Sequence, residues 1–438
     1  MEKKNLALAD NVAAVLQDDY VLISTAQGKL RRLSVENFIA SINSGNEQLL
    51  RQVAWGVEVN TNDGTSNTTL LGNSAMLQQY INSCGRYLVT NDGKAAKLAT
   101  HDSTLYADGT TLDETKGHIM VYMPQLYCLV RKNSATKHTE AWFSQMPLGG
   151  KILPATCVAA YKGATVSAKL VSRTQLKPTT GKDITQYWQL AQANGNNWGI
   201  MNFHAWTKLA FLFNAYYKSR NSQKKIGYGV AGSKECTESV KNLTTGATAA
   251  LGDQSGKVAI TRTNGADCSR ISLFGVEDIY GWLWECLQGI VFDFSVADTS
   301  QEESECLMYV YSHNKIYNGV ISGEEPQDGD LPADCDYDYL QYCSKTSSTD
   351  FISTINTYTS PGWPCPLVSA LEGEGSDGDY CDQAGISFYV DTVPVIGGCY
   401  DNGLKCGIYC QSNYISPGYC SARLQYYGQL SFVNGSEI

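Results

Sequence analysis

The half of the chain that follows Asn221 has no segment with the 3.6-residue apolar repeat of an amphipathic helix. Glycine, serine, asparagine and aspartate divide it into short apolar runs such as KVAIT, SLFGV, GISFYV and LSFV. Short runs bounded by these residues are typical of strands joined by turns and loops. This half therefore predicts irregular β-structure, and it limits the choice of fold more than any other feature of the 438 residues.

Helical periodicity is concentrated in two neighbouring segments near the middle of the chain. In DITQYWQLAQANG the apolar residues recur at helical spacing, with Asp183 as the N-terminal cap and Gly195 as the stop. In FHAWTKLAFLFNAYYKSR the same spacing covers residues 203–217, and its basic end lies at the C-terminus, where it suits the helix dipole. Two helices beside short strands predict an α+β fold.

The first 50 residues predict a small separate module. Residues 21–24 indicate a short strand, and SVENFIASI predicts a helix capped by Ser34. A piece of this size buries little apolar surface alone. We therefore expect residues 1–50 to attach to a partner or to self-associate.

The rest of the chain predicts two further regions. Residues 51–135 indicate a β-rich spacer, in which HIMVYMPQLYCLV, residues 118–130, is the strongest strand candidate. This strand should end or bulge at Pro124, because proline cannot donate to the ladder. Residues 136–438, with both helices and the irregular β-structure, then form the C-terminal domain.

The composition excludes several classes of function. The chain carries a net charge of -10, whereas a nucleic-acid-binding protein needs a basic face that displaces counterions from phosphates. No stretch approaches the ~18 apolar residues of a membrane-spanning helix. Asp10 and Asn11 interrupt the apolar stretch near the start, so no secretion signal is predicted. We expect a globular protein that neither binds nucleic acid nor inserts into a membrane.

The cysteines predict packing rather than chemistry. Fifteen is an odd number, so they cannot all pair within one chain, and no C-x-x-C motif or histidine at zinc-ligand spacing accompanies them. We predict reduced thiols packed as small hydrophobic side chains, and no metal. The alternative is a redox or soft-metal site at Cys406 and Cys410, with Cys399 and Cys420 nearby, because thiolates bind copper(I).

Other patterns are weak signals of chemistry. Gly227, Gly229 and Gly232 match G-x-G-x-x-G, but a helix end precedes them where a dinucleotide site needs a strand, so we predict a glycine-rich turn. None of the five histidines lies in a motif that pairs a base with a nucleophile, and His204 is expected on a helix surface. The acidic segment 323–340 lacks the glycine of an EF-hand and is interpreted as a solvated loop. We predict no catalysed reaction and no cofactor.

The segment GVEDIYGWLWECLQGIVF, residues 275–292, is rich in aromatic side chains and poor in charge. Taken alone it predicts buried core, with a ligand-stacking site as the alternative. Its acids, Glu277, Asp278 and Glu285, each need a partner if they are covered.

Several segments, in order, resemble one family. FGVEDIYGWLWECLQGI resembles the GxENxxGNxWEWxxG signature of the C-type lectin fold in its formylglycine-generating-enzyme branch. GGCYDNGLKCGIYC followed by SARLQY resembles the GGSWxNGxxxGxF and GARL ending of that branch. The helix pair, QKKIGYG after it and VAAYKGATVSAKLVSRTQLKPT before it follow the order found in tail-fibre and diversity-generating-retroelement variable proteins of phages that infect gut Bacteroidales. The resemblance covers roughly residues 50–438 and is most specific in the last forty.

The chain departs from these signatures at four positions and is therefore similar to a diverged member. Tyr400 stands where tryptophan is usual, and Cys399 where serine or another small residue is usual. Asp278 and Leu283 replace asparagine-like polar residues.

The resemblance implies that residues 409–420, YCQSNYISPGYC, lie on an exposed binding face. Their composition agrees, because tyrosine gives a large, stiff contact while serine, asparagine and glycine adapt their hydrogen bonds, as in antibody paratopes. Tyr409, Tyr414 and Tyr419 are expected as anchors; the alternative is that these tyrosines cover the core. The predicted ligand-binding residues are Tyr400, Asp401, Leu404, Lys405, Tyr409, Gln411, Ser412, Asn413, Tyr414, Ile415, Ser416 and Tyr419.

The function that the resemblance implies is adhesion. We expect a tail-fibre protein of the virion that binds a host-surface glycan or protein, contacts other tail proteins through residues 1–50 and assembles as a homotrimer. One alternative is a copper-dependent oxidase of the formylglycine-generating type, using Cys406 with Cys410 or Cys399 with Cys406. The other is a surface adhesin of the bacterium itself, which the absence of a predicted secretion signal disfavours.

Overall fold

A computed structural model describes residues 14–17, 20–24, 30–59, 67–133, 135–232, 240, 242–260, 268–293, 303–314, 336–343, 349–352, 354–357, 364–370, 382–385, 395–412 and 417–438. Within them, helices and strands mix along the chain, which confirms the predicted α+β class. Of the acidic segment 323–340, only its last five residues are described, and these belong to a strand.

Six α-helices occur among the described residues: α1 (Val35–Asn43), α2 (Glu47–Val53), α3 (Ser74–Ser83), α4 (Ile184–Gln192), α5 (Phe203–Tyr217) and α6 (Ser222–Ile226). Helices α4 and α5 confirm both predicted central helices, and Asp183 forms a capping box at the start of α4. Helix α1 confirms the predicted cap at Ser34. Helices α3 and α6 were not predicted; asparagine side chains, Asn73 and Asn221, cap their first turns. None of these helices is long and apolar enough to cross a membrane.

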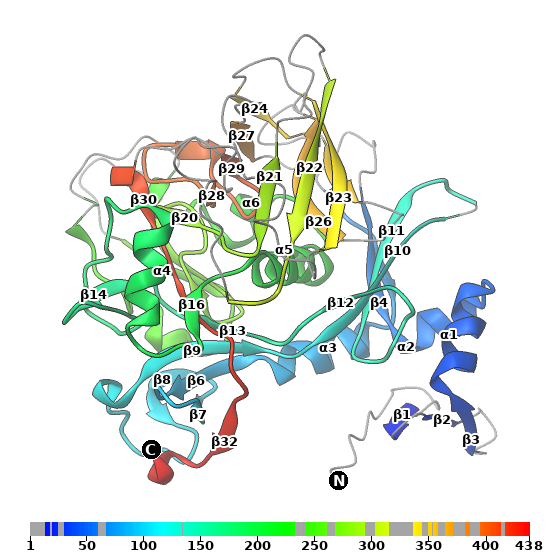
Figure 1. The fold of residues 1–438 in the computed structure, drawn as a ribbon, viewed down its shortest axis with the longest axis horizontal. Helices are drawn as coiled ribbons and strands as arrows, with labels where there is room; N and C mark the ends of the chain where they lie inside the picture. The colour runs from blue at the N-terminus through cyan, green and yellow to red at the C-terminus, as the bar shows by residue number, and fades with distance from the viewer. Residues whose placement is uncertain are drawn as a thin grey trace.

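Helix α5 runs through the centre of the molecule (Figure 1). Every residue from 203 to 215 is buried, so the prediction that His204 lies on a helix surface is wrong. Even Lys208 is covered, and its Nζ donates to the main-chain oxygens of Met123 at 3.2 Å and Pro124 at 2.8 Å. Because residues 203–215 of α5 are buried on all sides, their apolar period does not mark a solvent-facing side.

Two sheets form the framework around α5. The first has the order β12 (Lys151–Leu153), β10 (Leu126–Lys132), β11 (Thr139–Ser144), β4 (Trp55–Val59) and β5 (Leu70–Gly72). The second has the order β16 (Trp198–Ile200), β31 (Leu424–Tyr426), β13 (Thr156–Ala159), β9 (His118–Met123), β6 (Gly85–Val89), β7 (Lys94–Ala99) and β32 (Ser431–Val433), with β8 (Asp102–Tyr106) paired to β7.

These sheets correct the predicted organisation. The break between β9 and β10 falls at Pro124, as predicted. However, β4 pairs with β11 and β9 pairs with β13, so both sheets cross the predicted boundary at residue 135. A separate spacer over residues 51–135 is therefore wrong, because its strands complete sheets that later residues also build.

The remaining strands form smaller sheets. One hairpin joins β14 (Ala164–Val166) to β15 (Lys169–Val171), and another sheet holds β17 (Gly256–Ala259), β18 (Ser269–Leu273) and β19 (Val276–Glu277). A six-stranded sheet has the order β24 (Thr349–Phe351), β27 (Gln383–Gly385), β29 (Gln411–Ser412), β28 (Val395–Ile396), β20 (Trp284–Cys286) and β30 (Cys420–Ser421). Two others contain β21 (Ile290–Asp293), β22 (Glu303–Val310) and β23 (Asp336–Cys343), and β25 (Thr354–Thr357) and β26 (Pro364–Ala370).

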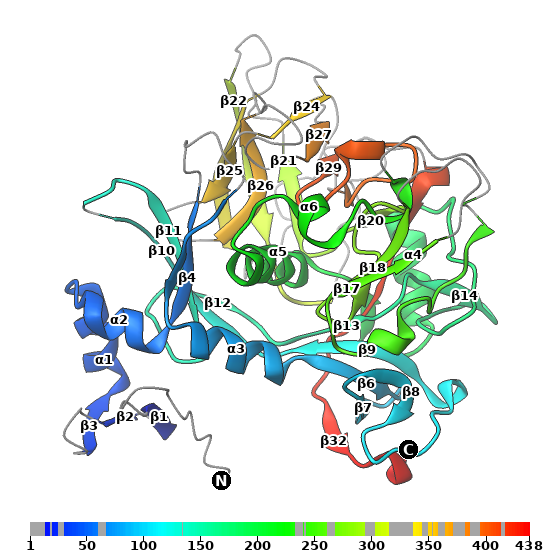
Figure 2. The same ribbon diagram turned by 180° about the vertical axis from the view of Figure 1, so that it is seen from behind.

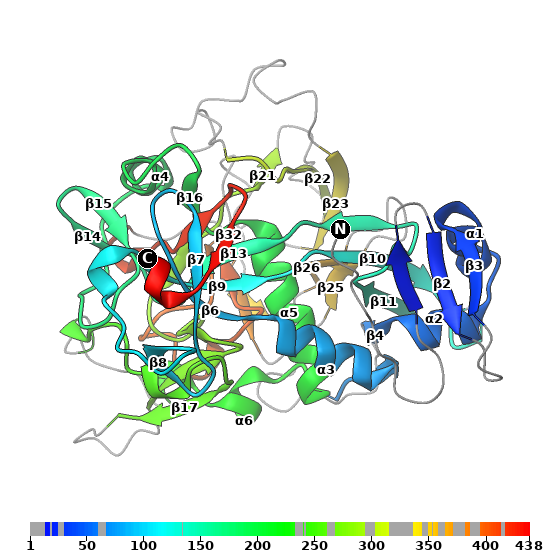
Figure 3. The same ribbon diagram turned by 90° about the horizontal axis from the view of Figure 1, so that it is seen from below.

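The N-terminal elements lie at one end of the molecule (Figure 3). Strands β1 (Ala14–Gln17), β2 (Tyr20–Ser24) and β3 (Leu30–Ser34) form an antiparallel sheet that leads into α1. The predicted boundary at residue 50 falls inside α2, where Leu50 and Val53 are fully buried in the main core. Helix α2 therefore ties this end of the chain to the body of the protein.

Candidate functional site

The two segments that resemble the lectin-fold signatures lie side by side in the six-stranded sheet, of which Figure 1 labels β20, β28 and β30 and Figure 2 labels β20 and β29 from behind. Strand β20 pairs antiparallel with β28 and parallel with β30, so Glu285 stands between Ile396 and Ser421. More than one hundred residues separate β20 from β28 and from β30 in the sequence. The sheet thus joins the aromatic segment to the C-terminal segment that was predicted to bind.

A buried ionic cluster fastens this arrangement. We call Glu285, Lys162 and Arg423 the Glu285 centre; all three side chains are fully covered. Lys162 Nζ pairs with Oε1 of Glu285, and Arg423 Nε donates to Oε2 at 3.1 Å. Arg423 also donates to main-chain oxygens of Ala159 at 3.1 Å and Ala160 at 2.9 Å. One side chain of the terminal Ala-Arg-Leu therefore binds two distant strands.

Electrostatics keep the Glu285 centre ionised. Burial alone would raise the pKa of Glu285, but Arg423 and Lys162 outweigh burial and hold that pKa below its usual value. Burial lowers the pKa of Lys162 to about 8, with Glu285 opposing the shift and Arg423 adding to it. At pH 7 the centre therefore holds two cations and one anion.

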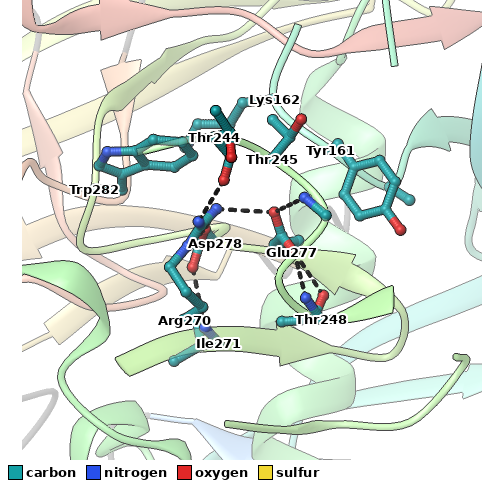
Figure 4. A network of polar contacts seen from close by, with 12 residues as sticks. Tyr161, Lys162, Thr244, Thr245, Thr248, Arg270, Ile271, Glu277, Asp278 and Trp282 are labelled. Atoms are coloured by element: carbon teal, nitrogen blue, oxygen red, sulfur yellow. Dashed lines mark hydrogen bonds and ion pairs between the residues drawn. The ribbon is translucent and has the colours of Figure 1, made fainter. Parts of the chain in front are cut away.

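A second buried cluster, which we call the Arg270 centre, consists of Arg270, Glu277 and Asp278 (Figure 4). It contains one base and two acids, whereas the Glu285 centre contains two bases and one acid. The Arg270 guanidinium binds Oε1 of Glu277 at 2.8 Å and Oδ2 of Asp278 at 2.5 Å, and it stacks on the ring of Trp282 at 4.2 Å. The other oxygen of Asp278 accepts from the amide of Ile271 at 3.0 Å. Each predicted buried acid thus has a partner, which confirms that expectation, and the aromatic segment is core.

The sequence analysis did not identify Lys162 and Arg270 as the partners of the buried acids. Lys162 lies in VAAYKGA and Arg270 in CSRISLF, two largely apolar runs. A charged residue in such a run is a signal for a buried partner, because a covered charge must be paired. This signal could have identified both cations, although it could not have assigned each to its acid.

A small group of predicted residues is exposed above this support. We define the exposed patch as Asp401, Leu404, Lys405 and Tyr419. The first three lie on the turn that contains the 3₁₀ helix η5 (Gly403–Lys405), and Leu404 is 39% exposed. Tyr419 is half-buried, and its ring lies 5.9 Å from that of Tyr400, which leads into this turn. The patch combines an acid, a base, an aliphatic and an aromatic side chain.

The expectation that Tyr409 is an outward anchor is wrong. Its side chain is 0% exposed, its hydroxyl donates to the main-chain oxygen of Ala210 on α5 at 3.3 Å, and its amide donates to Asp382 at 2.7 Å. The physical reason is strand order: β29, which follows Tyr409, lies inside the sheet between β27 and β28. For Tyr409, the alternative that the ring covers the core is correct.

Three other predicted binding residues are also covered. Tyr400 is 2% exposed, and Gln411 and Ser412 are buried in β29. A ligand cannot reach these side chains in this conformation. The predicted residues Asn413, Tyr414, Ile415 and Ser416 lie outside the described residues.

The cysteines pack as predicted where they are described. Ten of them are buried. Gly398 has φ of +69°, and a Cβ there would lie 2.7 Å from Sγ of Cys406 and 3.1 Å from Sγ of Cys410, so the close packing of these thiols requires glycine. Burial raises the pKa of Cys399 and of Cys406 well above the usual value. Among the described residues, no three His, Cys, Asp or Glu side chains are placed to hold a metal ion.

The glycine-rich segment is a turn, as predicted. Gly229 begins the 3₁₀ helix η2 (Gly229–Ala231) at φ of +68°, and a Cβ there would contact Gly281 at 3.1 Å. This close approach explains the glycine on both segments.

No protein-family model matches the chain, and no curated protein is found to be related to it. Its function must therefore be inferred from its own residues.

Proposed function

We propose that this protein is a receptor-binding adhesin of the phage tail-fibre type, which contacts a host-surface glycan or protein through the exposed patch. The observation that carries the proposal is the contrast between the patch and its support. Asp401, Leu404 and Lys405 are open to solvent, while the strands beside them are fixed by the buried Glu285 centre. A binding face on a rigid base loses little conformational freedom when it binds.

The C-type lectin fold is part of this proposal. Its support is the pairing of β20 with β28 and β30, which joins the two lectin-like signatures in one sheet. The position of helices α4 and α5 before that sheet follows the same order. The homotrimer, the attachment of residues 1–50 to other tail proteins and the place in a virion rest on the resemblance alone. Native mass measurement of the full chain tests the trimer, and a stable monomer contradicts it.

The rival oxidase function is less well supported by the thiols. In such an oxidase the thiols that hold copper(I) must also be reached by the substrate, and Cys399 and Cys406 are both buried. Titrating the reduced protein with copper(I) distinguishes the two functions. Stoichiometric binding that Cys406→Ser abolishes, together with oxidation of a peptide thiol, favours the oxidase.

The adhesin proposal predicts that the patch can be disabled without loss of the fold. A variant carrying Leu404→Ala and Tyr419→Ala should lose more than about tenfold in affinity for host cells, since tyrosine is enriched among the residues that dominate interfaces and the leucine side chain adds apolar area that binding would bury. The measurement is binding of labelled protein to a panel of gut Bacteroidales cells. The melting temperature should change little, because both side chains are partly exposed.

The matched control carries Ile152→Ala and Tyr216→Ala, an exposed aliphatic and an exposed aromatic residue outside the patch. This control should bind like the unmodified protein. Equal binding by the patch variant and the control would remove the patch from the proposal.

A further inference from the structure

A second feature, separate from the exposed patch, has the properties of a small-molecule site. A cavity of about 370 Å³ opens between the 3₁₀ helix η1 (Glu114–Lys116), the start of β9 and the β14–β15 hairpin. Its volume is within the range of small-ligand pockets. The cavity shares no residue with the exposed patch. It is lined by Asn91, Thr115, Lys116, Gly117, His118, Val166, Ser167, Lys169, Val171, Arg173 and Asn194. In Figure 1, β14 lies at the left edge, below β30.

The lining carries three cations and no carboxylate, although the chain as a whole is acidic. Arg173 donates to the main-chain oxygens of Gly117 at 3.1 Å and Thr115 at 3.2 Å, and Lys116 Nζ donates to the main-chain oxygen of Ile438 at 2.7 Å. The two carbonyl groups orient Arg173 and leave its charge uncompensated. Ile438 is the last residue of the structure, so its oxygen belongs to a carboxylate that already pairs with Lys116. Lys169 is held at the cavity by its pairing with Val166 across the hairpin.

The nearby acids do not fill the cavity. Glu114 is engaged by Thr174, whose amide and hydroxyl lie 2.7 Å and 2.9 Å from its carboxylate oxygens. Asp113 binds the hydroxyl and amide of Thr115, and its pKa is lowered mainly by these bonds, with smaller contributions from Lys116 and Arg173. The lining therefore has an excess of positive charge.

His118 adds a hydrogen-bond acceptor to the lining. Its side chain is 1% exposed, its Nε2 lies 3.1 Å from Oδ1 of Asn91, and its Nδ1 has no hydrogen-bond partner among the described residues. Burial, then the charges of Arg173 and Lys169, lowers the pKa of His118 to about 3 against an opposing interaction with Asn194, so the ring is neutral at pH 7. Because Oδ1 of Asn91 can only accept, Nε2 of His118 donates to it, and Nδ1 is an acceptor that needs a donor such as a hydroxyl group.

We propose that this cavity binds an acidic sugar, with its carboxylate at Lys169 and Arg173 and a hydroxyl donating to Nδ1 of His118. A sugar acid supplies both an anion and hydroxyl donors on one small frame. A fully ionised sulfate ion has no hydrogen to donate, and a neutral sugar leaves Lys169 and Arg173 without an anionic partner. The site uses other residues than the patch, so either proposal can fail while the other stands.

Titration calorimetry of the full chain with D-glucuronate, D-glucose and sulfate tests the inference. Glucuronate should bind, and glucose and sulfate should each bind at least about tenfold more weakly, because each satisfies only half of the site. Absence of glucuronate binding at millimolar concentrations overturns the proposal. Sulfate binding as strong as that of glucuronate overturns the sugar part and leaves a simple anion site.

Variants assign the binding to this cavity. Lys169→Gln should weaken glucuronate binding by about tenfold, since one charge-assisted contact is lost. The control Lys177→Gln alters a lysine outside the lining, whose Nζ lies 3.1 Å from Asn242, and should leave affinity unchanged. Unchanged affinity in Lys169→Gln contradicts the proposal.

The hydroxyl contact has its own variant. His118→Phe keeps a ring beside Trp198 but removes Nδ1, so glucuronate should lose its advantage over sulfate. Circular dichroism establishes that this variant is folded. If it is not, Arg173→Gln replaces it as the second test of the cavity and should also weaken glucuronate binding.

Discussion

The two buried ionic clusters solve the same problem with opposite charge balance. The Glu285 centre holds one acid and two bases, and the Arg270 centre holds one base and two acids. Main-chain oxygens stabilise the extra cation in the first, including those of Ala159 and Leu283. Main-chain amides stabilise the extra anion in the second, including those of Gly246 and Thr248. The surplus charge is thus carried by backbone dipoles in both.

The two centres are also connected. Arg423 of the first centre donates to the main-chain oxygen of Glu277 in the second at 2.7 Å. Taken together they contain three acids and three bases, which cancel in formal charge. The opposite net charges of the two centres therefore show that their electrostatic stability has to be considered for both together, because neither centre is neutral alone.

The largest expected effect comes from removing the charge of Glu285, the single acid of the Glu285 centre. Glu285→Gln leaves Lys162 and Arg423 buried without a carboxylate and should reduce the free energy of unfolding by about 3–5 kcal/mol. Urea unfolding measures it, with the exposed Glu36→Gln as a control that should change little. A loss below about 1 kcal/mol would show that the carbonyls alone stabilise the two cations.

A smaller effect depends on pH. The pKa of Lys162 falls from the ordinary 10.5 to about 8 on folding, so the unfolded chain binds more protons between these values. Stability contributed by this residue should therefore rise with pH across that window, by up to about 1.4 kcal/mol per pH unit. Lys162→Met should remove this rise. Identical pH profiles for the two proteins would contradict the assignment.

The smallest expected effect lies in the Arg270 centre. Burial raises the pKa of Asp278, so ionising it in the fold is costly, and Glu277 remains to pair with Arg270. Asp278→Asn should therefore change stability by less than about 1 kcal/mol at pH 7. Since the folded pKa is raised, the contribution of Asp278 falls as pH rises through it, and the variant should lack this fall. A loss as large as that of Glu285→Gln would remove the distinction between the centres.

The sequence predicted the parts of the fold that local signals determine. Asp183 caps α4 and Pro124 separates β9 from β10, because a cap and a missing amide act within a few residues. Helix α3 escaped prediction since its residues are mixed in polarity and its stability depends on packing against the rest of the molecule.

The candidate site was predictable only in part. The turn that exposes Asp401, Leu404 and Lys405 was identified, whereas Tyr409 was placed on the wrong side. Strand order decides this orientation, and strand order depends on contacts between residues far apart in the chain. The same limit applies to Lys162, which meets Glu285 across more than one hundred residues.

The six-stranded sheet has one more consequence, for engineering. Strands β29 and β30 both belong to it, so Ser412 and Cys420 are each fixed by strand pairing. Foreign peptides inserted between these strands would start and finish on supports that already exist. Doubling the length of such an insert costs only about 0.6 kcal/mol in closure entropy, which makes the protein a candidate scaffold for displaying grafted sequences.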